Sequence, residues 1–152
     1  MKPLKVVKYL VVHCVANRCN KPFSVESLIN TGLQKYGQCS YHYYVRYDGS
    51  VIPLLPESVQ GIHVKGYNWC SLGIVYEGGL DEFGHPADTR TEVQKHALYE
   101  LLKYLTRDYP DARILGHCEF PRVNKKCPCY FPSKTYAELQ PDARCKIIPL
   151  NP

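Results

Sequence analysis

The stretch Ser40–Leu55, SYHYYVRYDGSVIPLL, carries the clearest fold signal in the chain. Two runs rich in aromatic and β-branched residues flank the pair Asp48-Gly49. An Asp-Gly pair between such runs is typical of a tight β-hairpin, because both residues tolerate the positive φ angles that the turn requires. The stretch therefore predicts two antiparallel strands joined at Asp48-Gly49.

Buried strands and amphipathic helices are expected on both sides of this hairpin. Nearly continuous apolar runs predict strands at residues 4–13, 71–76 and 112–117. Ser24 is expected to cap a helix that ends at Gly37, and apolar residues at helical spacing predict a second helix over about 93–108. Thr89 and Glu92 have the spacing of a capping box for the second helix. This alternation indicates an α/β fold, with a mixed central β-sheet flanked by helices.

Length and composition limit the class of protein. The 152 residues, 45% of them apolar, suit a single domain over 1–152, with a core of about 5–131 and a C-terminal tail of 132–152. The formal net charge of +5 includes no long basic run, so we expect no nucleic-acid partner. No stretch of about 20 apolar residues predicts a membrane span, and no signal peptide is recognisable. We expect a monomer that is made in the cytoplasm.

Three potential metal ligands fall where an α/β sheet commonly forms its ligand site. His13 and His117 end two predicted strands, and Cys127 follows on a short loop. Two imidazoles and one thiolate are the protein ligands of a catalytic zinc site whose fourth position holds water. Alternatively, the histidines are ordinary hydrogen-bonded residues, or Cys129 completes a closed structural site.

Four short motifs occur in a characteristic order: VVHC, SYHYYVRYDGSV, GIHVKGYNWCSLGIVYEGG and GHCEFPRVNKKCPCY. Together they resemble the zinc-dependent N-acetylmuramoyl-L-alanine amidases of type 2, which include amidase-type phage lysozymes and the animal peptidoglycan recognition proteins. The resemblance covers about residues 6–131. It implies one zinc ion per chain in a groove at the strand ends. It also implies peptidoglycan or muropeptide as substrate, cut between N-acetylmuramic acid and L-alanine.

The resemblance also implies roles for single residues. The zinc ligands it implies are His13, His117 and Cys127. Catalytic roles fall to Tyr41, which would face the metal-bound water, and to Lys125, which would lie beside the scissile carbonyl. The implied substrate-binding residues are His63 and Asn68.

Zinc chemistry connects these residues to amide hydrolysis. Zinc lowers the pKa of a bound water to about 7 and polarises the carbonyl, so that hydroxide can attack. The charge of Lys125 would stabilise the resulting oxyanion, an effect of about 3 kcal/mol for a well-placed donor. Tyr41 is expected to orient the water or to donate a hydrogen bond, because a phenol with a pKa of about 10 is a poor base.

Three more cysteines lie beside the proposed ligands. Cys129 is expected to support the loop of Cys127. Cys14 and Cys118 each follow a ligand, so strand alternation predicts that they face away from zinc, where they would pack or pair as a disulfide. Packing is favoured in a reducing cytoplasm. The full ligand set favours an enzyme that acts on the cell wall after release or export, and the alternative is a module that recognises peptidoglycan without cutting it.

Overall fold

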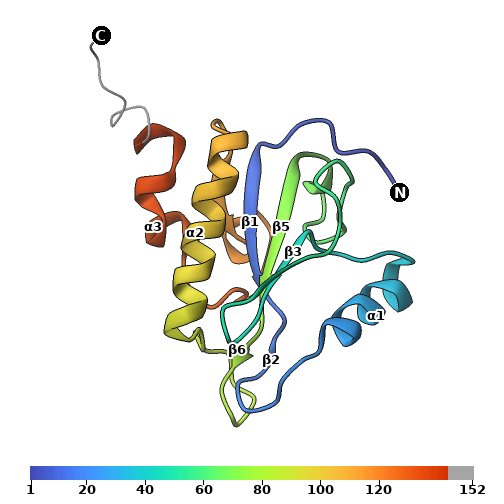
Figure 1. The fold of residues 1–152 in the computed structure, drawn as a ribbon, viewed down its shortest axis with the longest axis vertical. Coiled ribbons are helices and arrows are strands. Elements are labelled where there is room, and N and C mark those ends of the chain that lie inside the picture. The colour runs from blue at the N-terminus through green and yellow to red at the C-terminus, as the bar shows by residue number, and fades with distance from the viewer. Residues whose placement is uncertain (144–152) are drawn as a thin grey trace.

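The computed structural model describes residues 1–143 and is built on a five-stranded mixed sheet (Figure 1). In the order β4-β3-β5-β1-β7, its strands are β4 (Val51–Pro53), β3 (Tyr43–Val45), β5 (Ser71–Tyr76), β1 (Tyr9–Cys14) and β7 (Arg113–Gly116). Only β3 and β4 pair antiparallel within this sheet. A separate small sheet joins β2 (Asn17–Arg18) to β6 (Gly79–Leu80). The expected fold class is confirmed.

The hairpin forms where the Asp-Gly pair predicted it. Tyr44 of β3 lies opposite Ile52 of β4, and the turn closes with a hydrogen bond from the backbone N–H of Arg46 to the carbonyl of Ser50 at 2.9 Å. Gly49 has a φ of +85°, which a residue with a side chain rarely adopts. The turn residues therefore set the register between β3 and β4 at this edge of the sheet.

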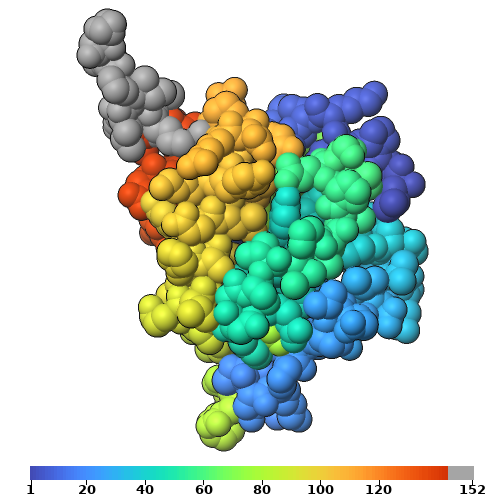
Figure 2. Space-filling model, in the orientation of Figure 1, coloured from blue at the N-terminus to red at the C-terminus, as the bar shows by residue number. Residues whose placement is uncertain are grey.

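Two helices cover opposite faces of the sheet. Alternate residues of β5 point to opposite sides. Ile74 packs in the core that includes Leu98 and Leu102 of α2 (Glu92–Asp108), whereas Val75 packs with Leu28 of α1 (Val25–Tyr36). Figure 1 shows α2 on one side of the strands and α1 on the other. Figure 2, in the same orientation, shows that α2 and the hairpin segment form much of this outer surface.

The ends of the two helices only partly follow expectation. Ser24 caps α1 by accepting a hydrogen bond from the backbone N–H of Ser27, and Gly37 ends this helix at a φ of +74°, as predicted. The capping box of α2 was placed wrongly, because it is formed by Thr91 and Gln94. The hydroxyl of Thr89 instead accepts a hydrogen bond from the backbone N–H of Gly79 at 2.8 Å, which ties it to the small sheet.

The described part of the C-terminal tail packs against strand β7. This segment contains α3 (Pro132–Thr135) and the 3-10 turn η3 (Ala137–Leu139). The side chain of Gln140 pairs with both the N–H and the carbonyl of Ile114, at 2.8 Å each. These bonds satisfy the backbone of an edge strand that has no further neighbour in the sheet. Within residues 1–143, no helix has the length and apolarity that a membrane crossing requires.

Candidate active site

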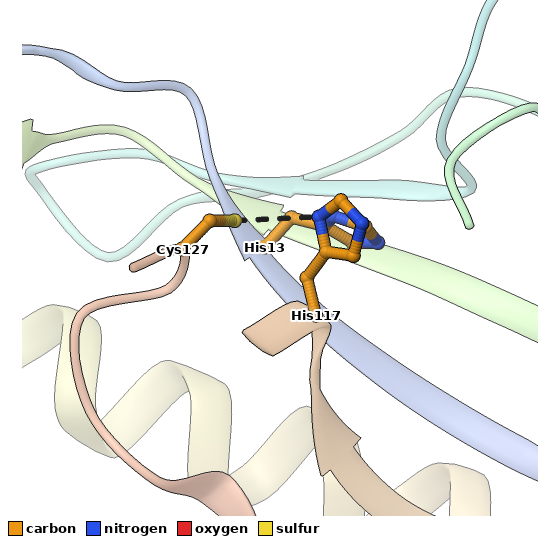
Figure 3. A group of neighbouring side chains, drawn as sticks. All are labelled: His13, His117 and Cys127. Atoms are coloured by element: carbon orange, nitrogen blue, oxygen red, sulfur yellow. Dashed lines mark hydrogen bonds between the residues drawn. The ribbon is translucent and has the colours of Figure 1, made fainter. Parts of the chain in front are cut away.

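His13, His117 and Cys127 converge at the carboxyl end of β1 (Figure 3). His13 is the fifth residue of β1 and is only 2% exposed. His117 was expected to end a strand, but β7 ends at Gly116 and His117 begins the 3-10 turn η2 (His117–Glu119). Because β1 and β7 are parallel neighbours, both imidazoles reach the same edge of the sheet.

The loop of Cys127 is held over these two histidines by its backbone. The N–H of Cys118 donates to the carbonyl of Cys127 at 2.8 Å, and the hydroxyl of Tyr76 donates to the carbonyl of Pro128 at 2.6 Å. One bond ties the loop to the residue after His117, and the other ties it to β5. The nine residues between His117 and Cys127 are thus folded back so that the thiol meets the imidazoles.

The spacing of the three side chains fits a single metal ion. Their ligand atoms all lie within 4.8 Å of one another, and Sγ of Cys127 lies 4.0 Å from Nδ1 of His13. This second distance is less than the total of about 4.4 Å for one Zn–N bond and one Zn–S bond, so one ion can contact both atoms. In residues 1–143 no other group of three or more histidine, cysteine or acidic side chains has this arrangement.

Electrostatics favour the form of Cys127 that binds metal. The pKa of the Cys127 thiol is lowered, mainly by a hydrogen bond from the thiol of Cys14 and then by its contacts with the imidazoles of His117 and His13. The backbone N–H of Cys14 also donates to Sγ of Cys127 at 3.2 Å. The same contact raises the pKa of Cys14, which therefore keeps its proton. Cys127 is the thiolate of this pair.

His13 is enclosed by aromatic side chains. Its ring lies 5.2 Å from the ring of Tyr41 and 4.9 Å from that of His63, measured between centroids. Its Nε2 lies 2.8 Å from Nδ1 of His63. Burial lowers the pKa of His13 and lowers that of His63 well below its usual value, so both imidazoles are neutral near pH 7. Burial also raises the pKa of Tyr41, whose phenol remains protonated.

Two cavities open from this group. The first, of about 360 Å³, runs along α1, and its lining includes His13, Tyr41, His63, His117, Lys125 and Cys127. The second, of about 910 Å³, shares only His117 and Lys125 with the first. No acidic residue lines the second cavity, and its cationic side chains are Lys8, Lys65, Arg122 and Lys125. The structure therefore places both predicted catalytic residues, Tyr41 and Lys125, in the cavity that contains the three potential ligands.

Asn68 and the remaining cysteines have structural contacts. The side-chain oxygen of Asn68 accepts hydrogen bonds from the backbone N–H groups of His63 and Val64, both at 2.9 Å, which shapes the loop that carries His63. The thiol of Cys129 donates to the carbonyl of Gly79 at 3.4 Å. Cys14 and Cys118 are free thiols. Cys14 lies in the core on the α2 side, as alternation predicted, yet its thiol touches Cys127 because the loop crosses the end of the strand.

The family described as N-acetylmuramoyl-L-alanine amidase matches residues 3–130, which include all three potential ligands. The chain belongs to this amidase family. Its endolysin relative from Enterobacteria phage K11 is 33% identical to the amidase over 120 residues, which cover 78% of each chain.

Solved structures agree with this assignment. The Ph2119 endolysin from the Thermus scotoductus bacteriophage Ph2119 is 27% identical, with a TM-score of 0.68, and the match covers 82% of the amidase and 78% of that chain. Bumblebee PGRP-SA, at 18% identity and a TM-score of 0.69, covers 84% of the amidase and 79% of its own chain, which shows a likeness of fold alone. The matched family and the endolysin relatives support an enzyme more strongly than a module that binds peptidoglycan without cutting it. The amidase hydrolyses the amide bond between N-acetylmuramic acid and L-alanine in peptidoglycan.

Proposed function

We propose that the amidase is a zinc enzyme that holds one ion through His13, His117 and Cys127. The observation that carries this proposal is the convergence of two imidazoles and one cysteine sulfur within 4.8 Å. Three protein ligands leave a fourth position open, as in catalytic rather than structural zinc sites. Cys129 does not compete for that position, because its thiol bonds to Gly79. When bound, zinc would supply Lewis acidity and lower the pKa of a water molecule.

The other residues have separate proposed roles in catalysis and in substrate binding. Lys125 brings a positive charge to the cavity that contains the three ligands, where it would stabilise the negative charge that develops on the substrate carbonyl. The phenol of Tyr41, which keeps its proton, would donate a hydrogen bond to the attacking water or to the carbonyl. We also propose that His63, which lines this cavity, and Asn68 contact the substrate.

Metal analysis combined with a cleavage assay tests this proposal. The purified protein should contain one zinc ion per chain and should release stem peptides from peptidoglycan sacculi. Removal of the ion with a chelator should abolish release, and added zinc should restore it. Sacculi that are bound but never cut by the zinc-loaded protein would instead indicate a recognition module.

We also propose that the amidase is a monomer that reaches the wall after release from the cytoplasm. The likeness to the endolysin of phage K11 supports this route. Bacteria that express the chain should lyse only when their inner membrane is permeabilised. Lysis without permeabilisation would indicate another route to the wall, and light scattering would measure the oligomeric state.

A further inference from the structure

A chain of hydrogen bonds leads from His13 into the interior of the molecule. Nε2 of His13 lies 2.8 Å from Nδ1 of His63, and Nε2 of His63 lies 3.2 Å from the hydroxyl of Ser71. That hydroxyl lies 2.7 Å from the carbonyl of Tyr67. Ser71 is fully buried at the start of β5. The chain thus joins the proposed metal ligand to a fixed backbone acceptor.

The backbone acceptor determines where each proton lies. A carbonyl only accepts, so the hydroxyl of Ser71 donates to Tyr67 and can only accept from Nε2–H of His63. With its single proton on Nε2, the His63 ring has a free lone pair on Nδ1, which accepts a hydrogen bond from Nε2–H of His13. This arrangement leaves Nδ1 of His13 without a proton, and Nδ1 is the nitrogen that faces Sγ of Cys127.

We propose that Ser71 and His63 are positioning residues that hold His13 in the tautomer whose Nδ1 binds the metal. The inference rests on the proposed zinc site, and it gives His63 a role that is separate from contact with substrate. A partner on the second ring nitrogen of a metal-binding histidine fixes the orientation of the ring and commonly changes metal affinity by about 10- to 100-fold.

The strand beneath His63 is shaped for this arrangement. A Cβ atom on Gly73 would lie 2.9 Å from both Cγ and Nδ1 of His63, closer than side-chain contacts allow. Ser71 and Gly73 are two residues apart on β5, so both face the same side of the sheet. The backbone N–H of Gly73 donates to Nδ1 of the buried His42 at 3.0 Å, which fixes the strand in place. A serine and a glycine in this register provide the acceptor and the room for one imidazole.

Tautomers can be observed directly in the metal-free protein. Long-range ¹H–¹⁵N correlation spectra of the protein labelled at histidine should show the proton on Nε2 of both His13 and His63. In the Ser71→Ala variant, His63 loses its acceptor, and the pattern of His13 should become mixed. A wild-type His13 with its proton on Nδ1 would overturn the proposal.

Zinc affinity, measured by competition with a chelator, tests the consequence. His63→Asn and His63→Leu form a matched pair, because the side chains are similar in size but only asparagine offers an acceptor close to the position of Nδ1. We expect Ser71→Ala and His63→Leu to weaken zinc binding by about tenfold or more, and His63→Asn to weaken it less. Thr106→Ala, which removes a buried hydroxyl from α2, is the control and should bind zinc like the wild type.

The outcomes separate this inference from the proposed zinc site. If the wild-type protein binds no zinc, the zinc site itself fails. If the wild type binds zinc and Ser71→Ala binds it equally well, only the positioning role is overturned. Equal losses in His63→Asn and His63→Leu would also overturn it, because the acceptor would then make no difference.

Discussion

The backbone N–H of Cys14 donates a hydrogen bond to Sγ of Cys127 at 3.2 Å, although 113 residues separate the two in sequence. Cys14 thereby binds the thiolate with its backbone, while His13, one residue earlier, directs its imidazole toward the same proposed metal position. Hydrogen bonds from backbone N–H groups stabilise an anion more than its neutral form. The backbone at the end of β1 therefore stabilises the thiolate form of Cys127.

Substitution of single cysteines should separate the ligand from its neighbour. Cys127→Ser should lose zinc, because a serine hydroxyl is not ionised at neutral pH and is a poor ligand. Cys129→Ser should keep zinc, because that side chain bonds to the carbonyl of Gly79. Metal content of the two purified variants decides the assignment. The ligand assignment is wrong if Cys129→Ser loses the ion and Cys127→Ser keeps it.

Lys125 and its neighbour Lys126 provide a second matched pair. Lys125 lines the cavity that contains the three proposed ligands. Lys126 does not line that cavity, although both lysines line another cavity beside Phe131. Lys125→Ala should retain zinc and lose about 10² to 10³ in kcat, the usual cost of one oxyanion donor. Lys126→Ala should lower kcat only slightly. Steady-state hydrolysis of a defined muropeptide measures both, and equal small losses would remove Lys125 from the catalytic group.

Local sequence signals predicted most of the fold. The hairpin at Asp48-Gly49, the cap at Ser24 and the end at Gly37 depend on residues within a few positions of one another. The capping box of α2 was misplaced because Thr89 and Thr91 are both plausible caps in sequence. A long-range bond from Gly79 to Thr89 decides between them. Such a bond has no local signature.

The sequence predicted that His13, His117 and Cys127 would lie together, but it did not predict what surrounds them. His13 and His117 follow apolar strand runs, which is a local pattern. The contact between Cys14 and Cys127 depends on the path of a loop. The bond between Ser71 and His63 depends on the packing of that histidine against β5. Strand alternation along β5 does place Ser71 and Gly73 on one face. This was the one pattern in the sequence that could have indicated a polar side chain packed against that face.

The buried carboxylate of Glu77 should make a large contribution to stability. Glu77 is 1% exposed and accepts hydrogen bonds from the backbone N–H groups of Phe23 and Tyr47, as well as from Arg46. Glu77→Ala leaves these donors without their acceptor and should lower the free energy of unfolding by about 3 kcal/mol or more. Glu92→Ala, at a side chain that is 90% exposed, is the control. Denaturant unfolding of both variants measures the difference, and similar losses would contradict the assignment.

Acid should destabilise the metal-free amidase through three histidines, two of them buried and one half-buried. Burial lowers the pKa values of His13, His42 and His63 in the folded state. Below about pH 6.5 the unfolded chain therefore binds protons that the folded chain excludes. Stability rises with pH wherever the unfolded state binds more protons, so it should fall on acidification below about pH 6.5. Each histidine can contribute up to about 1.4 kcal/mol per pH unit.

Denaturant unfolding in the presence of a chelator, at about pH 7.5 and about pH 5.5, measures this loss. His42→Gln should reduce the dependence on pH, because it removes one imidazole that the folded state keeps neutral, even though it also removes bonds to Gly73 and Val59. His96→Gln alters an exposed histidine and should leave the dependence unchanged. A wild-type protein that is equally stable at both pH values would mean that these three histidines take up protons without unfolding. Their neutral state would then not be enforced by burial.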